Sequence, residues 1–145
     1  MSLKQISVLA FVAAAVCLVW LAFQYALLGT GPVKIGIQVA AVLLMVWARL
    51  TFGLRSFHAA ANPTAGGLVT HGPYRYLRHP IYSAVLYFLW AGIAAHPSKT
   101  HILVALLASA LLGVRMISEE RLLLGEYPEY ADYARRTPRV LPFLF

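Results

Sequence analysis

Charged side chains are scarce in this sequence of 145 residues, and acidic ones are the scarcest. Asp, Glu, Lys and Arg together make up 12% of the chain, whereas apolar residues make up 61%. A soluble domain of this length needs a much larger share of charged surface. The composition therefore excludes an ordinary globular protein in water and indicates a single domain that lies in a lipid bilayer.

The chain also lacks a pair of cysteines and any recognisable metal-binding pattern. Cys17 is the single cysteine, so no internal disulfide can form, and we interpret it as a small buried hydrophobe. The histidines show no spacing such as H-E-x-x-H, and no G-x-G-x-x-G is present. We therefore predict neither a metal site nor a soluble nucleotide-binding domain.

Four apolar segments predict an all-α integral membrane protein. About 20 apolar residues cross the hydrocarbon core, and the first segment is too long for a cleavable signal peptide. We expect one membrane domain, 1–145, with a polar connection and a C-terminal tail that begins as an interfacial helix. The expected spans are 3–28, 33–52, 80–95 and 100–120, with the connection at 53–79 and the tail at 121–145.

The distribution of positive charge predicts the topology. In the four-span arrangement only Lys34 and Lys99 lie on one side, and every other Lys and Arg lies on the opposite side. The positive-inside rule then places both termini, the connection and the tail in the cytoplasm. The net charge of +7 collects at the ends of apolar segments. It therefore indicates topology and contact with anionic lipid, and no nucleic-acid partner is expected.

The segment 71–82, at the start of the third span, holds two Arg, two His, three Tyr and two Pro. Pro80 suits the first turn of a helix, and His79 before it can act as the cap. The free N–H groups of Ile81 and Tyr82 then offer a place for an anionic group. Arg and Tyr anchors at a membrane surface would explain the same composition, and both interpretations stay open.

The fourth span carries charge at its end. Arg115 and Glu119 are four residues apart and share a helix face, either as an interfacial salt bridge or as the lining of a cavity. Every acidic residue lies between Glu119 and Asp132. If the third and fourth spans form a hairpin, the basic segment 71–82 meets these carboxylates. The resulting pocket suits a small molecule that carries both charges.

A ridge of small residues marks the earlier part of the same span. Ala105, Ser109 and Gly113 recur at four-residue spacing. Such a ridge allows another helix to approach closely, so we expect it to pack against a neighbouring span.

Two motifs resemble those of the isoprenylcysteine carboxyl methyltransferase family and, more generally, the phospholipid methyltransferases. The first is Gly72-Pro73-Tyr74-Arg75-Tyr76-Leu77-Arg78-His79-Pro80-Ile81-Tyr82. The second is Glu119-Glu120-Arg121-Leu122-Leu123, followed by Tyr130, Tyr133 and Arg136-Thr137-Pro138-Arg139-Val140-Leu141-Pro142. The resemblance covers roughly half the chain, from Leu68 to Pro142.

The resemblance implies an integral membrane enzyme that uses S-adenosylmethionine. It implies a catalytic role for Arg115, on the substrate side, and for Glu119. Either glutamate of the pair could contact the cofactor. The implied cofactor contacts are Gly66, Gly67, Leu68, Val69, Tyr74, His79, Pro80, Ile81, Tyr82, Glu119 and Glu120.

The implied reaction is methylation of a lipophilic acceptor, with the carboxylate of an isoprenylcysteine-like substrate as the first candidate. A carboxylate is ionised at neutral pH, so it needs no strong base. We expect Arg115 to orient this carboxylate and Glu119 to hold Arg115 or the cofactor. A prenylated or other lipophilic substrate would enter from the membrane. A lipid amine, a thiol and other isoprenoid acids remain alternatives, and the oligomeric state is left open.

Two other functions fit parts of the pattern. A membrane reductase of the sterol-reductase type would bind NADPH, with Arg135, Arg136 and Arg139 available for the 2′-phosphate. A non-enzymatic helical bundle that transports or scaffolds is the third possibility. It would predict an ionisable residue in mid-membrane or symmetric halves, and the sequence shows neither.

Overall fold

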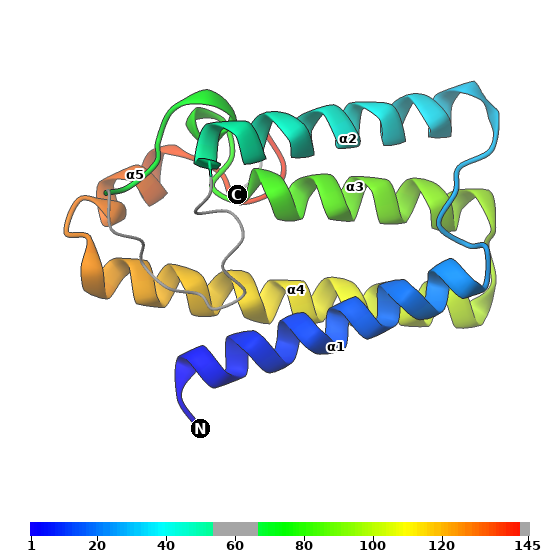
Figure 1. The fold of residues 1–145 in the computed structure, drawn as a ribbon, viewed down its shortest axis with the longest axis horizontal. Helices are drawn as coiled ribbons and strands as arrows, with labels where there is room; N and C mark the ends of the chain where they lie inside the picture. Colours follow the sequence, from blue (N-terminus) through cyan, green and yellow to red (C-terminus); the bar gives the residue numbers. More distant parts are fainter. Residues whose placement is uncertain (54–66, 143–145) are drawn as a thin grey trace.

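The protein is an all-α bundle, which confirms the predicted fold class (Figure 1). The structure, a computed structural model, describes residues 1–53 and 67–142. Its elements, in chain order, are α1 (Leu3–Phe23), α2 (Gly31–Phe52), the 3-10 helix η2 (Gly72–Arg75), α3 (Pro80–Ala95), α4 (Lys99–Glu126) and α5 (Tyr130–Arg136).

The four long helices form two closely packed pairs, α1 with α4 and α2 with α3 (Figure 1). Helices α3 and α4 follow each other through a tight turn and run in opposite directions. The start of α3 therefore lies at the same end of the bundle as the end of α4. Figure 1 shows η2, α5 and the C-terminal segment gathered at this end.

Three helices, α1, α2 and α4, are long and apolar enough to cross a membrane, and α3 is a shorter apolar helix. At 1.5 Å per residue, α3 is about 24 Å long. The outer faces of the bundle expose large apolar side chains such as Leu9, Val16, Leu43 and Leu103. An apolar outer face is what a lipid environment requires, and the chain is a membrane protein with several apolar helices.

The helix ends have local causes. Ser2 and Gln5 form a capping box at the start of α1. The hydroxyl of Ser98 accepts a hydrogen bond from the His101 N–H at the start of α4. Helix α1 ends at Phe23, before the limit of the apolar pattern at residue 28, because Tyr25 adopts a positive φ of 54°. Helix α4 continues to Glu126, beyond residue 120.

The connection between α1 and α2 is held tightly against α3. The Gln38 amide donates hydrogen bonds to the carbonyl oxygens of Leu27, at 2.6 Å, and Phe88, at 3.1 Å. Gly92 of α3 allows this approach, because a Cβ at that position would lie 2.3 Å from the Leu27 carbonyl oxygen. The far end of the bundle is therefore fixed by the buried polar side chain of Gln38 and by the absence of a side chain at Gly92.

The expected small-residue ridge packs only in part. Ala105 is fully buried, and the Ser109 hydroxyl accepts a hydrogen bond from Trp90 Nε1 at 3.1 Å. At Gly113 the expectation of a close approach is wrong, because a Cβ there would meet nothing within 4 Å. Among the described glycines, the closest approach of another backbone segment is at Gly92, outside the ridge.

Candidate functional site

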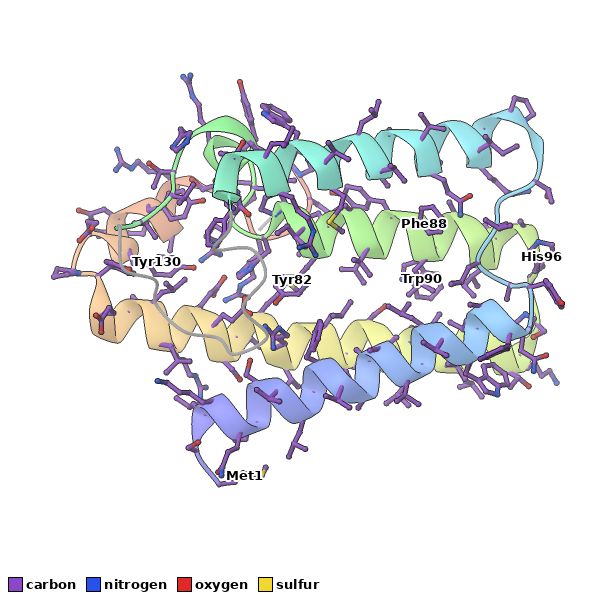
Figure 2. The ribbon with its side chains drawn as sticks, in the orientation of Figure 1. Met1, Tyr82, Phe88, Trp90, His96 and Tyr130 are labelled. Carbon is purple, nitrogen blue, oxygen red and sulfur yellow. The ribbon has the colours of Figure 1, made fainter. Side chains whose placement is uncertain are left out.

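The first turn of α3 and the last part of α4 meet through polar side chains. His79 Nε2 lies 3.0 Å from Glu120 Oε1, and the Tyr82 hydroxyl donates a hydrogen bond of 2.6 Å to Glu119 Oε1. Figure 2 shows Tyr82 projecting from α3 into the space between α3 and α4. The basic and acidic motifs, far apart in sequence, therefore form one site.

Arg115 is the centre of the first half of this site. Its guanidinium contacts Glu119 through Nη2, at 3.0 Å, and donates from Nε to the Tyr82 hydroxyl, at 2.5 Å. Its Nη1 donates to the carbonyl oxygen of Ser7, at 3.2 Å. Only 4% of Arg115 is exposed. A buried cation in an apolar bundle needs such partners on every side, and these four residues form what we call the Arg115 cluster.

Glu120 is the centre of the second half, which we call the Glu120 cluster. Its carboxylate accepts from His79 Nε2, lies 3.2 Å from Arg78 Nη1, and pairs with Arg139 through Nε and Nη2, the latter at 2.8 Å. Both carboxylate oxygens are thus engaged by basic groups. His79 also links the two halves, because its Nδ1 lies 3.9 Å from Glu119 Oε2.

The C-terminal segment is bound to the start of α3 by main-chain hydrogen bonds. The Arg78 N–H donates to the Pro138 carbonyl at 2.8 Å, and the His79 N–H donates to the Arg139 carbonyl at 3.1 Å. The hydroxyl groups of Ser83, at 3.0 Å, and Tyr87 both donate to the Val140 carbonyl. The tail is therefore part of the site wall.

His79 occupies the N-cap position of α3, but its side chain makes no capping hydrogen bond. The prediction that His79 acts as the cap residue is confirmed by its position and by its non-helical backbone, with φ −125° and ψ 58°, although the ring takes no part in capping. The ring faces the glutamates of α4 instead, because a buried imidazole gains more from a carboxylate than from a main-chain N–H. The Ser83 N–H bonds to the His79 carbonyl at 2.9 Å and closes the first turn.

Buried tyrosines line the side of the site formed by η2 and α5. Burial, with a contribution from the Glu119 carboxylate, raises the pKa of the Tyr74 phenol above its ordinary value. The Tyr133 hydroxyl donates to the Tyr74 carbonyl at 2.6 Å and ties α5 to η2. Burial and the Glu120 carboxylate raise the pKa of Tyr130 to about 12, so all three phenols are neutral at physiological pH.

The structure brings most of the predicted site residues to this end of the bundle. Pro80 and Ile81 form the first turn of α3, beside His79 and Tyr82. Gly67 is exposed, and Leu68 and Val69 are half-buried in the segment before η2. The predicted contact at Gly66 lies outside the described residues.

The sequence patterns indicated no role for Ser7, Phe11 and Ser83, and none for Arg78 beyond its place in the first motif. Arg139 was considered only as a 2′-phosphate contact of the alternative reductase, and not as a partner of Glu120. Ser7 offered a signal, as one of the few polar residues of the first apolar span. Across residues 1–53 and 67–142, no three His, Cys, Asp or Glu side chains could hold a metal ion together.

An apolar cavity of about 220 Å³ lies between α1, α2 and α3. On α3 the cavity is lined from Ala84 to Leu89, and Ala84 directly follows Ser83, which contacts the tail. Its lining is entirely apolar, so it suits a hydrocarbon group more than a charged one. The lining residues are Leu18, Leu27, Ala41, Val42, Met45, Val46, Ala84, Val85, Phe88 and Leu89.

These features define a helical membrane protein with a mixed-charge site at one end and an apolar cavity behind it. The sequence pattern of the isoprenylcysteine carboxyl methyltransferase family matches residues 33–125, which is more than half of the chain. The protein belongs to this family. The matched residues include the start of α3, Arg115 and both glutamates, whereas α1 and the tail lie outside the match.

Three curated relatives align with part of the chain. A cobalt-zinc-cadmium resistance protein of Cupriavidus metallidurans is 42% identical over 78 residues, which are 53% of this chain and 36% of the relative. A nickel-cobalt-cadmium resistance protein of Alcaligenes xylosoxydans xylosoxydans is 42% identical over 78 residues, 53% of this chain and 37% of the relative.

The third relative is methanethiol S-methyltransferase 2 of Bradyrhizobium diazoefficiens. It is 37% identical over 98 residues, which are 65% of this chain and 37% of the relative. The aligned segments thus span little more than a third of the length of each relative. No solved structure shows a significant match to the chain.

Proposed function

We propose that this protein is an S-adenosylmethionine-dependent membrane methyltransferase that acts on a lipophilic acceptor. The observation that carries the proposal is the contact between the start of α3 and the end of α4, where Tyr82 and His79 reach Glu119 and Glu120. Family membership supports the reaction type, and the apolar cavity supports the nature of the acceptor.

The chemistry of the site fits the methyl donor. A helix N-terminus, here at Ile81 and Tyr82, favours a carboxylate, and a glutamate favours an ammonium group or ribose hydroxyls. Between the two glutamates, Glu119 is the better candidate for the cofactor contact. Its side chain is 19% exposed, compared with 8% for Glu120, whose oxygens are engaged by three basic residues.

When bound, S-adenosylmethionine supplies an electrophilic methyl group on a sulfonium. The residues of the chain supply position and exclude water, because methyl transfer requires the nucleophile in line with the methyl group at about 3–3.5 Å. Arg115 fixes the Glu119 carboxylate and the Tyr82 hydroxyl at once. We therefore propose that Arg115 orients the acceptor largely indirectly, through the Glu119 carboxylate and the Tyr82 hydroxyl.

The first candidate acceptor is the carboxylate of an isoprenylcysteine-like molecule, whose hydrocarbon part would occupy the cavity beside Ala84. This carboxylate is ionised at neutral pH and needs no base. A thiol is the second candidate, because a relative 37% identical over 98 residues is a methanethiol S-methyltransferase. A thiol must lose its proton, and Glu119, through Tyr82, is placed to accept it.

We also propose that the site faces the cytoplasm. The positive-inside rule assigns both termini and the tail to that side, where S-adenosylmethionine is available, while the acceptor reaches the site from the bilayer. Reaction with a membrane-impermeant thiol reagent would test this orientation in a Cys17→Ser variant that carries one new cysteine at exposed Arg121. Labelling from the outside of intact cells would contradict the proposal.

The deciding experiment is transfer of labelled methyl groups from S-adenosylmethionine by the protein in lipid vesicles. The acceptor panel should contain an isoprenylcysteine carboxylate, an isoprenoid thioether acid, a lipid amine and an alkyl thiol, with identification of each product. We expect methylation of one class of acceptor and at least about a thousandfold loss in Arg115→Ala. Failure of the wild-type protein with every acceptor, together with no affinity for the donor, would contradict the proposed function.

A further inference from the structure

We propose that α1 helps to position the reacting groups. Its residues Ser7 and Phe11 are positioning residues for the Arg115 guanidinium. This inference rests on the proposed methyltransferase function. Helix α1 lies before residues 33–125, so the family match does not assign it a role in the site. The contacts of α1 with α4 are the most extensive between any two helices described, which gives α1 a rigid place beside Arg115.

Ser7 provides the first contact. It is completely buried, although it lies in a mostly apolar helix. Its carbonyl oxygen and its hydroxyl oxygen lie 3.2 Å and 3.4 Å from Arg115 Nη1. A buried serine in a membrane helix is retained where its oxygen has a polar partner. Here that partner is Arg115 Nη1, whereas Nη2 and Nε of the same guanidinium contact Glu119 and Tyr82.

Phe11 provides the second contact. It follows Ser7 by one helical turn and therefore lies on the same face of α1. The Arg115 Cζ atom lies 4.6 Å from the centroid of the Phe11 ring, within the range of a cation–π interaction. Tyr82 also presents its ring to the cation, at 5.9 Å, so aromatic rings from α1 and α3 both contact it.

The geometry of arginine links these contacts to the reacting groups. The guanidinium is planar and rigid, so the position of Nη1 on Ser7 also determines where Nε and Nη2 point. Nε donates to the Tyr82 hydroxyl and Nη2 contacts Glu119 Oε1. A displacement of α1, or loss of the Phe11 ring, would therefore misplace the Tyr82 hydroxyl and the Glu119 carboxylate without removing either.

The test compares Phe11→Leu with Phe11→Tyr, and both with Val12→Ala on the exposed face of the same helix. Phe11→Leu keeps the apolar volume but removes the π-system, so we expect kcat to fall roughly 2- to 30-fold. We expect Phe11→Tyr to retain kcat, and Val12→Ala to behave as wild type. The thermal midpoint should stay close to wild type in all three variants, and any loss of affinity for S-adenosylhomocysteine in Phe11→Leu should be smaller than the loss of kcat.

Equal kcat values for wild type and Phe11→Leu would overturn the inference. A parallel loss of kcat, donor affinity and thermal stability would also overturn it, because that result indicates a structural role only. A second readout does not depend on turnover: the Arg115 Nε–H resonance in protein with ¹⁵N-labelled arginine. We expect the Phe11 ring to shift it upfield and Phe11→Leu to remove the shift. An unchanged resonance would contradict the inference even if the proposed function fails.

Discussion

His79 Nε2 lies 3.0 Å from Glu120 Oε1, although 41 residues separate them in sequence. The same carboxylate binds Arg78 from the loop before α3 and Arg139 from the tail. Glu120 thus joins three segments of the chain at one point. Because its oxygens are engaged in this way, we propose that Glu120 belongs to the wall of the site and that Glu119 faces its interior.

The Glu120 cluster predicts a large effect on stability. We expect Glu120→Gln to lower the free energy of unfolding by about 2–3 kcal/mol, because it leaves buried basic groups without a full counter-charge. This value lies at or below the lower limit of the usual range of about 3–5 kcal/mol for a broken buried pair, because the Arg139 side chain is 45% exposed. Thermal unfolding in detergent measures the change. Glu126→Gln, at an exposed position, is the control, and an equal effect in both variants would contradict the assignment.

The Tyr82 hydroxyl predicts an effect on turnover. It accepts from Arg115 Nε and donates to Glu119 Oε1, so Tyr82→Phe leaves both groups without a common partner. We expect kcat to fall roughly 10- to 100-fold, as for loss of hydrogen bonds to charged groups. Steady-state kinetics with labelled donor tests this. The matched control is Tyr25→Phe, whose side chain is exposed, and a Tyr82→Phe enzyme with wild-type kcat would remove the hydroxyl from the account.

The apolar cavity predicts a change in acceptor preference. Ala84 lines it and is only 2% exposed, so Ala84→Phe places a ring inside the cavity. We expect KM for long-chain acceptors to rise roughly tenfold, the cost of excluding about two methylene groups. KM for a short acceptor should not change. Val39→Phe, on the exposed face of α2, serves as the control, and an equal change for short and long acceptors would show that the cavity does not hold the acceptor.

Two glycines predict opposite effects of the same substitution. A Cβ at Gly92 would lie 2.3 Å from the Leu27 carbonyl oxygen, so Gly92→Ala should destabilise the protein by about 3 kcal/mol or more. A Cβ at Gly113 would meet nothing within 4 Å, so Gly113→Ala should stabilise α4 by up to about 1 kcal/mol. Thermal midpoints of the two variants test this pair, and shifts of the same sign would contradict the packing.

Local sequence patterns predicted much of this fold. Apolar segment length indicated the helices, Pro80 indicated the start of α3, and the spacing of Arg115 and Glu119 indicated a contact on one helix face. These features depend on residues within one or two helical turns of each other, so the sequence alone contains them.

The rest depends on contacts between distant segments. No local pattern relates Ser7 to Arg115, which follows it by 108 residues, or shows that Arg139 reaches back to Glu120. The two glycines illustrate the same limit. Gly113 lies in a small-residue ridge but faces open space, whereas Gly92, outside any ridge, meets the backbone of another segment. Only the packing of the helices decides which small residue is needed.

The central claim is that the start of α3 and the end of α4 form a binding site for the methyl donor. Calorimetric titration of the purified protein in lipid nanodiscs with S-adenosylhomocysteine tests it most directly. The account predicts saturable binding that weakens at least about tenfold in Glu119→Ala and is unchanged in Glu129→Ala, an exposed position. No measurable binding, or binding of NADPH in its place, would contradict the account.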